Sequence, residues 1–150
     1  VIFFKRLLQR ELPLEIRRSI LSKLFMKFVR ATSANDFCQE LYMSEDDIKK
    51  LISEGMYVGS HTYNHYWLSS FHYNLQLKEI NLSMEFLEKI GAPTKNWIMC
   101  YPYGAYNKDT LRILKKLNCA IGITCTVDKV TLGKSDPLQY PRFDTNDYPQ

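Results

Sequence analysis

Two histidines four residues apart are the group in this sequence best suited to chemistry. The segment GSHTYNH, residues 59–65, carries His61 and His65 directly after an apolar run. Neutral imidazole is a good ligand for zinc and similar divalent ions, and a catalytic zinc usually has three protein ligands and one open position for water. A spacing of four brings both rings onto one ion if residues 61–65 form a helical turn. The alternative is that both are ordinary polar residues beside a strand.

Hydroxyl side chains lie on both sides of the first histidine. Ser60 and Thr62 are placed to hold the loop and to orient an imidazole through hydrogen bonds. A second conspicuous loop, YPYGAYN at residues 101–107, follows a later apolar run and contains three tyrosines. These two loops are the candidate functional segments.

The remaining sequence predicts the elements that position the two loops. Apolar runs typical of strands occupy residues 56–60, 97–101, 120–126 and 138–143. Patterns typical of helices occupy residues 14–30, 45–53, 74–90 and 109–117. This alternation predicts one α/β domain with largely parallel strands. Because the carboxyl ends of parallel strands open on one face, both loops should lie together there.

Two adjacent carboxylates, Asp46 and Asp47, invite a catalytic interpretation. They follow Ser44 at the start of a predicted helix, where the serine hydroxyl and the Asp47 carboxylate can satisfy free backbone amides as a capping box. Acidic side chains at a helix N-terminus are also favoured by the helix dipole. We therefore interpret this pair as structural.

Composition indicates a globular protein with one basic segment. The chain has 150 residues, of which 45% are hydrophobic and 24% charged. Residues 1–30 carry eight basic and two acidic side chains, which gives them a formal charge of +6 and leaves −2 for the remainder. We favour a solvated helix face with no nucleic-acid partner, and the alternative is a docking helix for nucleic acid or membrane.

Cysteine usage and hydropathy bear on the compartment. The four cysteines form no CxxC pair, and we expect them to be small core residues in a reducing compartment. No apolar stretch reaches the length of a membrane span. The start VIFFKRLLQR has four apolar residues before its first charge, which is too few for the apolar core of a signal peptide. A cytoplasmic location is the expectation.

Taken together, the paired loops resemble those of the polysaccharide deacetylase family, carbohydrate esterase family four, or NodB homology domain. The resemblance spans residues 42–147, from the lead-in LYMSEDDIKKLISEGMYVGSHTYNH to the later PRFDTND. It implies a distorted, incomplete (β/α) barrel with largely parallel strands. It also implies metal-dependent hydrolysis of N-acetyl, or sometimes O-acetyl, groups on a sugar or polysaccharide, a reaction at carbon–nitrogen bonds other than peptide bonds.

The resemblance also implies roles for individual residues. His61 and His65 match the two metal-binding histidines of the family's H-S/T-x-x-H motif, for which zinc is the expected divalent ion. The backbone amide of Tyr103, in the PYG core, would stabilise the developing oxyanion. Independently of the resemblance, Arg142 lies at the end of the last predicted strand, where it would either orient a site carboxylate or form a surface salt bridge. The residues that would line the carbohydrate-binding groove are Tyr63, Tyr101, Pro102 and Tyr106. The alternative is that they serve ordinary loop packing.

The sequence departs from the family in three places. The family's Asp-Asp motif at a strand end is missing, as is its second catalytic histidine, because His72 lies in no matching context. Tyr101 stands before Pro102, where the family usually has arginine. Two histidines without a carboxylate would hold metal weakly and would lack a base.

Two explanations for these departures stay open. Either residues 1–150 form a single deacetylase-like domain that lacks its N-terminal part, or the chain is a degenerate homologue. We favour the first, because the chain begins with Val1 and the opening VIFF predicts a strand inside a βα unit. The alternative to an enzyme is a non-catalytic relative that keeps the carbohydrate groove. The acid, the base, the sugar and the oligomeric state are not predicted.

Overall fold

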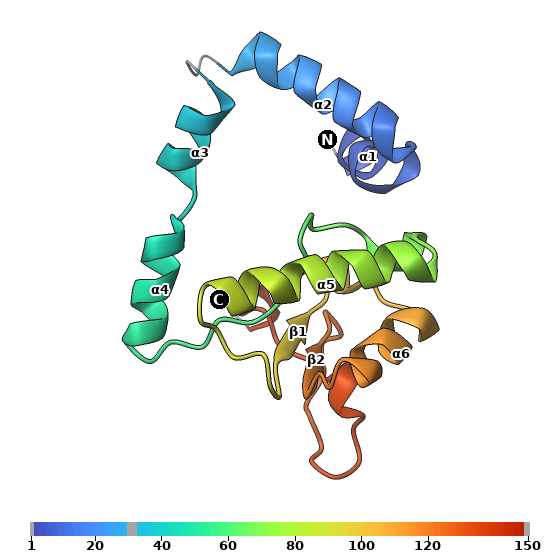
Figure 1. Cartoon of the computed structure of the whole chain (residues 1–150). Helices are drawn as coiled ribbons and strands as arrows, with labels where there is room; N and C mark the ends of the chain where they lie inside the picture. Colours follow the sequence, from blue (N-terminus) through green and yellow to red (C-terminus); the bar gives the residue numbers. More distant parts are fainter. Residues whose placement is uncertain (1, 30–32, 149–150) are drawn as a thin grey trace. The chain divides into compact units, whose positions relative to one another are not determined.

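The computed structural model describes residues 2–29 and 33–148 (Figure 1). The chain divides into two compact units, Val1–Ile48 and Lys49–Gln150. Each unit is described by itself. The prediction of one deacetylase-like domain over residues 1–150 stays a prediction.

The first unit consists of helices. Helix α1, Ile2–Arg6, continues into the π-helical turn η1, Leu7–Glu11, and α2, Leu14–Phe28, begins after Pro13. The predicted helix at residues 14–30 is thus confirmed up to Phe28, and Arg30 lies outside the described residues. The predicted opening strand is wrong for residues 2–4, and Val1 is not described. A four-residue run with β propensity needs a neighbouring strand, and here it instead extends into a helical turn.

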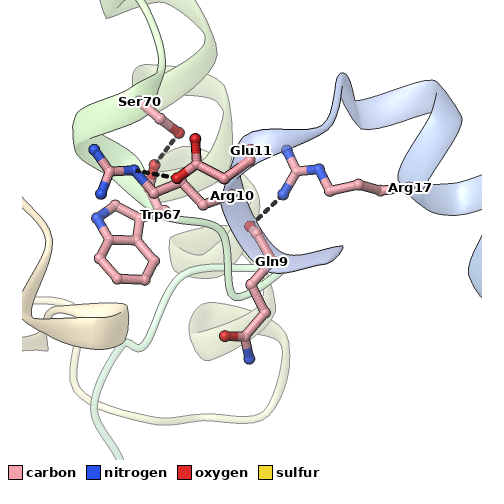
Figure 2. A network of polar contacts seen from close by, with 6 residues as sticks. All are labelled: Gln9, Arg10, Glu11, Arg17, Trp67 and Ser70. Carbon is pink, nitrogen blue, oxygen red and sulfur yellow. Dashed lines mark hydrogen bonds and ion pairs between the residues drawn. The ribbon is translucent and has the colours of Figure 1, made fainter. Parts of the chain in front are cut away.

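One basic residue of α2 is held inside the first unit. Arg17 is buried, and its guanidinium donates a hydrogen bond to the backbone oxygen of Gln9 in η1 (Figure 2). Arg10 forms an exposed ion pair with Glu11, at 3.8 Å. The docking-helix alternative needed Arg17 on an exposed face, so it is wrong at this position. Since η1 and α2 are joined only by Pro13 and its neighbour, Arg17 ties the two helical segments together.

Serine caps begin the next two helices. The Ser33 hydroxyl accepts a hydrogen bond from the amide of Asp36 at the start of α3, Ala34–Leu41. At α4, Glu45–Ser53, the Ser44 amide donates to Asp47 Oδ2 (2.9 Å) and the Asp47 amide donates to Ser44 Oγ (3.1 Å). The capping box and its structural interpretation are confirmed.

The second unit is built on a small parallel sheet. Strand β1, Ile98–Cys100, pairs in parallel with β2, Ile121–Ile123. Isolated parallel bridges extend this pairing on both sides, from Ser60 to Met99 and from Ile123 to Tyr140. Four consecutive chain segments therefore lie side by side in sequence order. The α/β class and the parallel arrangement are confirmed, and the described residues show no closed barrel.

Two predicted strands shorten to single bridges for local reasons. The Tyr57 hydroxyl accepts the backbone N–H of Ile98 (2.9 Å), so that amide is not available to a longer ladder before Ser60. Residues Pro137–Gln139 form a 3₁₀ turn, η4, in which Asp136 accepts the amide of Leu138 (3.0 Å). Side chains have taken the backbone groups that a strand would need.

Two helices cover the sheet and confirm the predicted ranges. Helix α5, Tyr73–Lys89, and helix α6, Lys108–Lys116, contact each other (Figure 1). Asn107 and Thr110 form a capping box at the start of α6. Trp97, Met99 and Tyr101 alternate along β1 toward the buried side. The core is completed by Leu68, Ile80, Ile113, Leu114 and Leu138.

The cysteines are free thiols, and not all of them are core residues. Cys100 and Cys119 are half-buried, and burial raises the pKa of the Cys119 thiol to about 11. Cys38 and Cys125 are exposed, so the core prediction is wrong for these two. Among the helices in the described part of the chain, none has both the length and the apolar character to cross a membrane.

Candidate metal and substrate site

The loop with the two histidines follows the Ser60 bridge and is not helical. Thr62 and His65 have φ angles of 63° and 55°, in the left-handed region, so the predicted helical turn is wrong. The two rings nevertheless lie together, with centroids of His61 and His65 4.7 Å apart and ring planes at 58°. Two left-handed residues let the loop double back within five positions, so the two rings lie close together. That they share one ion stays a prediction.

His61 is oriented by the next strand. Its Nδ1 lies 2.7 Å from the backbone oxygen of Cys100, at the end of β1. A carbonyl oxygen only accepts hydrogen bonds, so in the neutral ring Nδ1 carries the proton and Nε2 keeps its lone pair. This tautomer leaves Nε2 free to bind a metal, and a backbone carbonyl on the other nitrogen is a common support for a metal-binding histidine.

His65 contacts the second loop. Its Nδ1 lies 3.1 Å from the Tyr103 hydroxyl, and the ring centroids of the pair are 4.7 Å apart at 64°. Tyr103 in turn stacks on Trp67, at 4.7 Å and 9°. Burial lowers the pKa of His65, and the charge of His61 lowers it further, which favours neutral imidazole. The prediction that both loops lie on one face is confirmed by these contacts.

The PYG turn needs backbone conformations that glycine supplies best. Tyr103 and Gly104 have φ angles of 59° and 66°. A Cβ on Gly104 would lie 3.0 Å from the Cβ of Cys125, so a larger residue would be strained in conformation and in space. The turn is closed by hydrogen bonds from Gly104 N to Tyr101 O and from Ala105 N to Pro102 O, both 2.9 Å.

The other predicted groove residues lie in different environments. Tyr63 is 57% exposed and is available to a ligand. Tyr101 is 1% exposed, its hydroxyl donates to Leu138 O (2.6 Å), and Pro102 is also buried. The assignment of the side chains of Tyr101 and Pro102 to the groove is therefore wrong, because both belong to the core. Tyr106 is half-buried and stacks on Tyr101 at 4.7 Å, which agrees with loop packing.

Arg142 lies at the surface near the PYG turn. Its Nη2 approaches Cys125 Sγ (3.5 Å), and its charge contributes to lowering the pKa of Asp144, after hydrogen bonds chiefly from Asn146. Asp144 and Asp147 cap the 3₁₀ turn Thr145–Asp147. The role of Arg142 in orienting a carboxylate stays a prediction.

Comparison with known proteins assigns the family. The sequence profile described as polysaccharide deacetylase matches residues 20–122. The chain belongs to the polysaccharide deacetylase family. The resemblance based on the two loops is thereby confirmed.

Relatives of this deacetylase-family chain include proteins with solved structures. The chain is 25% identical over 105 residues to YxkH of Bacillus subtilis, a candidate polysaccharide deacetylase. The aligned part is 70% of this chain and 37% of YxkH. The Streptococcus pyogenes deacetylase PplD, solved with acetate, is 26% identical at a TM-score of 0.61, over 79% of this chain and 47% of PplD. BA0330 of Bacillus anthracis, a candidate polysaccharide deacetylase, is 28% identical at a TM-score of 0.58. This match covers 67% of this chain and 31% of BA0330. The chain thus spans less than half the length of each.

The donors in this deacetylase-family site fit a divalent metal in part. Imidazole suits zinc and neighbouring transition metals, and the rings of His61 and His65 lie with their centroids 4.7 Å apart. Within residues 2–29 and 33–148, no group of three or more His, Cys, Asp or Glu side chains gathers as a metal site. The role of His61 and His65 as metal ligands stays a prediction.

Three contributors to the site were missed at the sequence level. Trp67 stacks on Tyr103, and Asn64 is bound by Glu79 of α5. The position of Trp67, two residues after His65, was a usable signal. Glu79 gave none, because a glutamate on an amphipathic helix is usually on the solvent side.

Proposed function

We propose that this chain carries the metal- and substrate-binding part of a deacetylase acting on N-acetyl, or O-acetyl, groups of a sugar or polysaccharide. The observation that carries the proposal is the pairing of the His61 and His65 rings. The Nδ1 of His61 is supported by the Cys100 carbonyl at the end of β1, and that of His65 by Tyr103 of the second loop. Family membership supplies the reaction class. The expected divalent ion is zinc.

The residues of the two loops divide the work. When bound, a divalent ion supplies Lewis acidity, which polarises an acetyl carbonyl and makes water a better nucleophile. The Cys100 carbonyl holds the proton of His61 on Nδ1, and Tyr103 fixes the ring of His65. The backbone amide of Tyr103 is the proposed donor to the oxyanion. The proposal leaves the general acid and base unassigned.

Carbohydrate binding would use the aromatic side chains around the histidines, of which Tyr63 is exposed and Trp67 and Tyr103 are half-buried. Tyr63 projects from the histidine loop, and the stacked pair of Trp67 and Tyr103 lies beside His65. Aromatic faces bind the apolar faces of sugar rings. The same surface favours a second candidate function, a non-catalytic carbohydrate-binding relative.

The test compares the three histidines of the chain. We expect His61→Ala and His65→Ala to weaken zinc binding, measured by calorimetry, about 10-fold or more, because each removes one of two ligands. The matched control is His72→Ala, which changes an exposed histidine at the start of α5. Equal zinc affinity in all three variants would refute the metal site.

A second measurement separates the enzyme from the binding module. Acetate release from N-acetylglucosamine oligomers is measured with and without zinc, together with oligomer affinity. Zinc-dependent release that His61→Ala abolishes supports the deacetylase. Oligomer affinity that does not depend on zinc and survives His61→Ala supports the binding module.

A further inference from the structure

Helix α5 buries a row of polar side chains. Gln76, Glu79 and Ser83 are all buried, and their spacing of three and four residues places them on one face of the helix. Buried polar groups cost free energy unless they are hydrogen-bonded, so a row of them needs an explanation. Each of the three forms a hydrogen bond with a residue outside α5, in or beside the loops at the strand ends.

The contacts of this row reach both functional loops. The Ser83 hydroxyl lies 2.8 Å from that of Ser60, just before the histidine loop. Gln76 donates to Asn107, at the end of the second loop (3.3 Å). Glu79, between them, uses both carboxylate oxygens on one residue, Asn64. Oε2 accepts its backbone N–H (2.9 Å) and Oε1 accepts its side-chain amide (2.7 Å).

Asn64 lies between the two left-handed residues of the loop. Left-handed backbone is unfavourable for any residue with a Cβ, and most of all for a β-branched one such as Thr62. Such a conformation persists only where surrounding contacts over-determine it. The two bonds from Glu79, which is 2% exposed, fix the residue directly before His65.

We propose that Glu79 is a positioning residue of the metal site and acts through Asn64. It holds residues 61–65 in the strained conformation that brings the two imidazole rings together. The proposal rests on the proposed function in one respect, that the ligand of these rings is a divalent cation. Glu79 touches neither ring and has no catalytic role.

The test exchanges donors and acceptors across the Glu79–Asn64 contact. Glu79→Gln keeps the size of the side chain but places an amide donor opposite one of the two donors of Asn64. In the double variant Glu79→Gln/Asn64→Asp, the glutamine amide donates to the new carboxylate, and its oxygen still accepts the backbone N–H. Both hydrogen bonds and the total charge are then restored. Glu88→Gln is the matched control, the same change at an exposed position of α5.

Zinc affinity and the state of the histidine rings are both measured. We expect Glu79→Gln to weaken zinc binding about 10- to 100-fold, as loss of a supporting hydrogen bond does elsewhere. The double variant should return to within about 3-fold of the unmodified chain by the same argument, and Glu88→Gln should equal it. In metal-free protein, nitrogen NMR of the rings should change for His61 and His65 in Glu79→Gln and revert in the double variant. A structural loss alone would not be rescued in this way.

The possible outcomes separate the two proposals. If the unmodified chain binds zinc and Glu79→Gln binds it equally, the positioning role is overturned and the proposed function stands. If the unmodified chain binds no zinc, the metal proposal fails, and the ring spectra still decide the role of Glu79. If Glu79→Gln and the double variant both fail to fold, hydrogen exchange of the unmodified chain decides. The Asn64 amide must then be protected like those of α5, and exchange at the rate of an open loop overturns the proposal.

Discussion

Replacing Tyr101 by phenylalanine tests whether this tyrosine is a core residue or a groove residue. Tyr101 is 1% exposed, and its hydroxyl donates to the backbone oxygen of Leu138 at 2.6 Å. This bond crosses over Gly122, where a Cβ would lie 2.4 Å from both oxygens. The hydroxyl therefore ties the end of β1 to the segment beyond β2.

The magnitude follows from what the variant leaves behind. Removing one partner of a buried hydrogen bond costs about 1–3 kcal/mol, because the Leu138 carbonyl keeps its desolvation cost and loses its donor. We expect Tyr101→Phe to lower the free energy of unfolding by about 2 kcal/mol, in the middle of that range. For a unit of about 100 residues this corresponds to a fall in Tm of about 8 °C or more.

The matched control removes the same atom from the neighbouring ring. Tyr106 stacks on Tyr101, but it is half-buried and its hydroxyl donates to the side chain of Gln139 (3.1 Å), where water can substitute. Tyr106→Phe should cost about 0.5 kcal/mol. Urea unfolding followed by tryptophan fluorescence measures both variants, and carbohydrate affinity is measured on the folded proteins.

Two results would refute this reasoning. Equal losses of stability in the two variants would mean that the Tyr101 hydroxyl is not a buried tie. A large loss of carbohydrate affinity in folded Tyr101→Phe, with little change in stability, would return this residue to the groove.

Burial also raises the pKa of the Tyr101 phenol. Above about pH 10 the unfolded chain alone releases this proton, so the unmodified protein should lose stability there and Tyr101→Phe should lose less.

Three further variants probe the same unit. Gly122→Ala should destabilise it by about 3 kcal/mol, because the new Cβ would lie 2.4 Å from the Leu138 oxygen, and urea unfolding will show a smaller loss if the segment can move away. Tyr103→Phe keeps the backbone amide but removes the hydroxyl 3.1 Å from His65 Nδ1, so zinc affinity by calorimetry should fall about 10-fold, and unchanged affinity would contradict that support. The pKa of Asp136 is lowered, first by the backbone hydrogen bond from Leu138, so its stabilisation is present above the ordinary pKa and is lost as the pH falls through the lowered one. In Asp136→Asn, urea midpoints should therefore fall less between about pH 5 and pH 3 than in the unmodified chain, and parallel curves would contradict this.

The helices α2, α4, α5 and α6 could be predicted from the sequence because their signals are local, whereas the start of α1 was predicted as a strand. Residues 45–53 follow a serine cap, and residues 109–117 follow an Asn107 cap, so the bonds that begin each helix come from the adjacent sequence. Strand lengths could not be predicted in this way. Whether residues 56–59 form a ladder depends on Ile98, whose amide is taken by the Tyr57 hydroxyl 41 positions away.

The burial of Tyr101 could have been predicted from the alternation along β1. Trp97, Met99 and Tyr101 occupy every second position, and a period of two places them on one side of a strand. The family resemblance drew attention to the tyrosines of the loop, while the strand pattern assigned this one to the core. Where the two disagree, the periodicity is the stronger guide, since it reports the geometry of this chain directly.

The site itself shows why a motif predicts ligands better than it predicts their arrangement. The spacing of His61 and His65 was enough to predict convergent rings, yet the rings converge through two left-handed residues and not through a helical turn. A loop of five residues does not hold such a conformation alone. Glu79 and Ser83 of α5 contact Asn64 and Ser60, and we propose that the Glu79 contact holds the loop. The apolar side of α5, where Ile80 and Leu87 are buried, could be predicted from its own sequence, whereas the contacts of Glu79 and Ser83 with the loop could not.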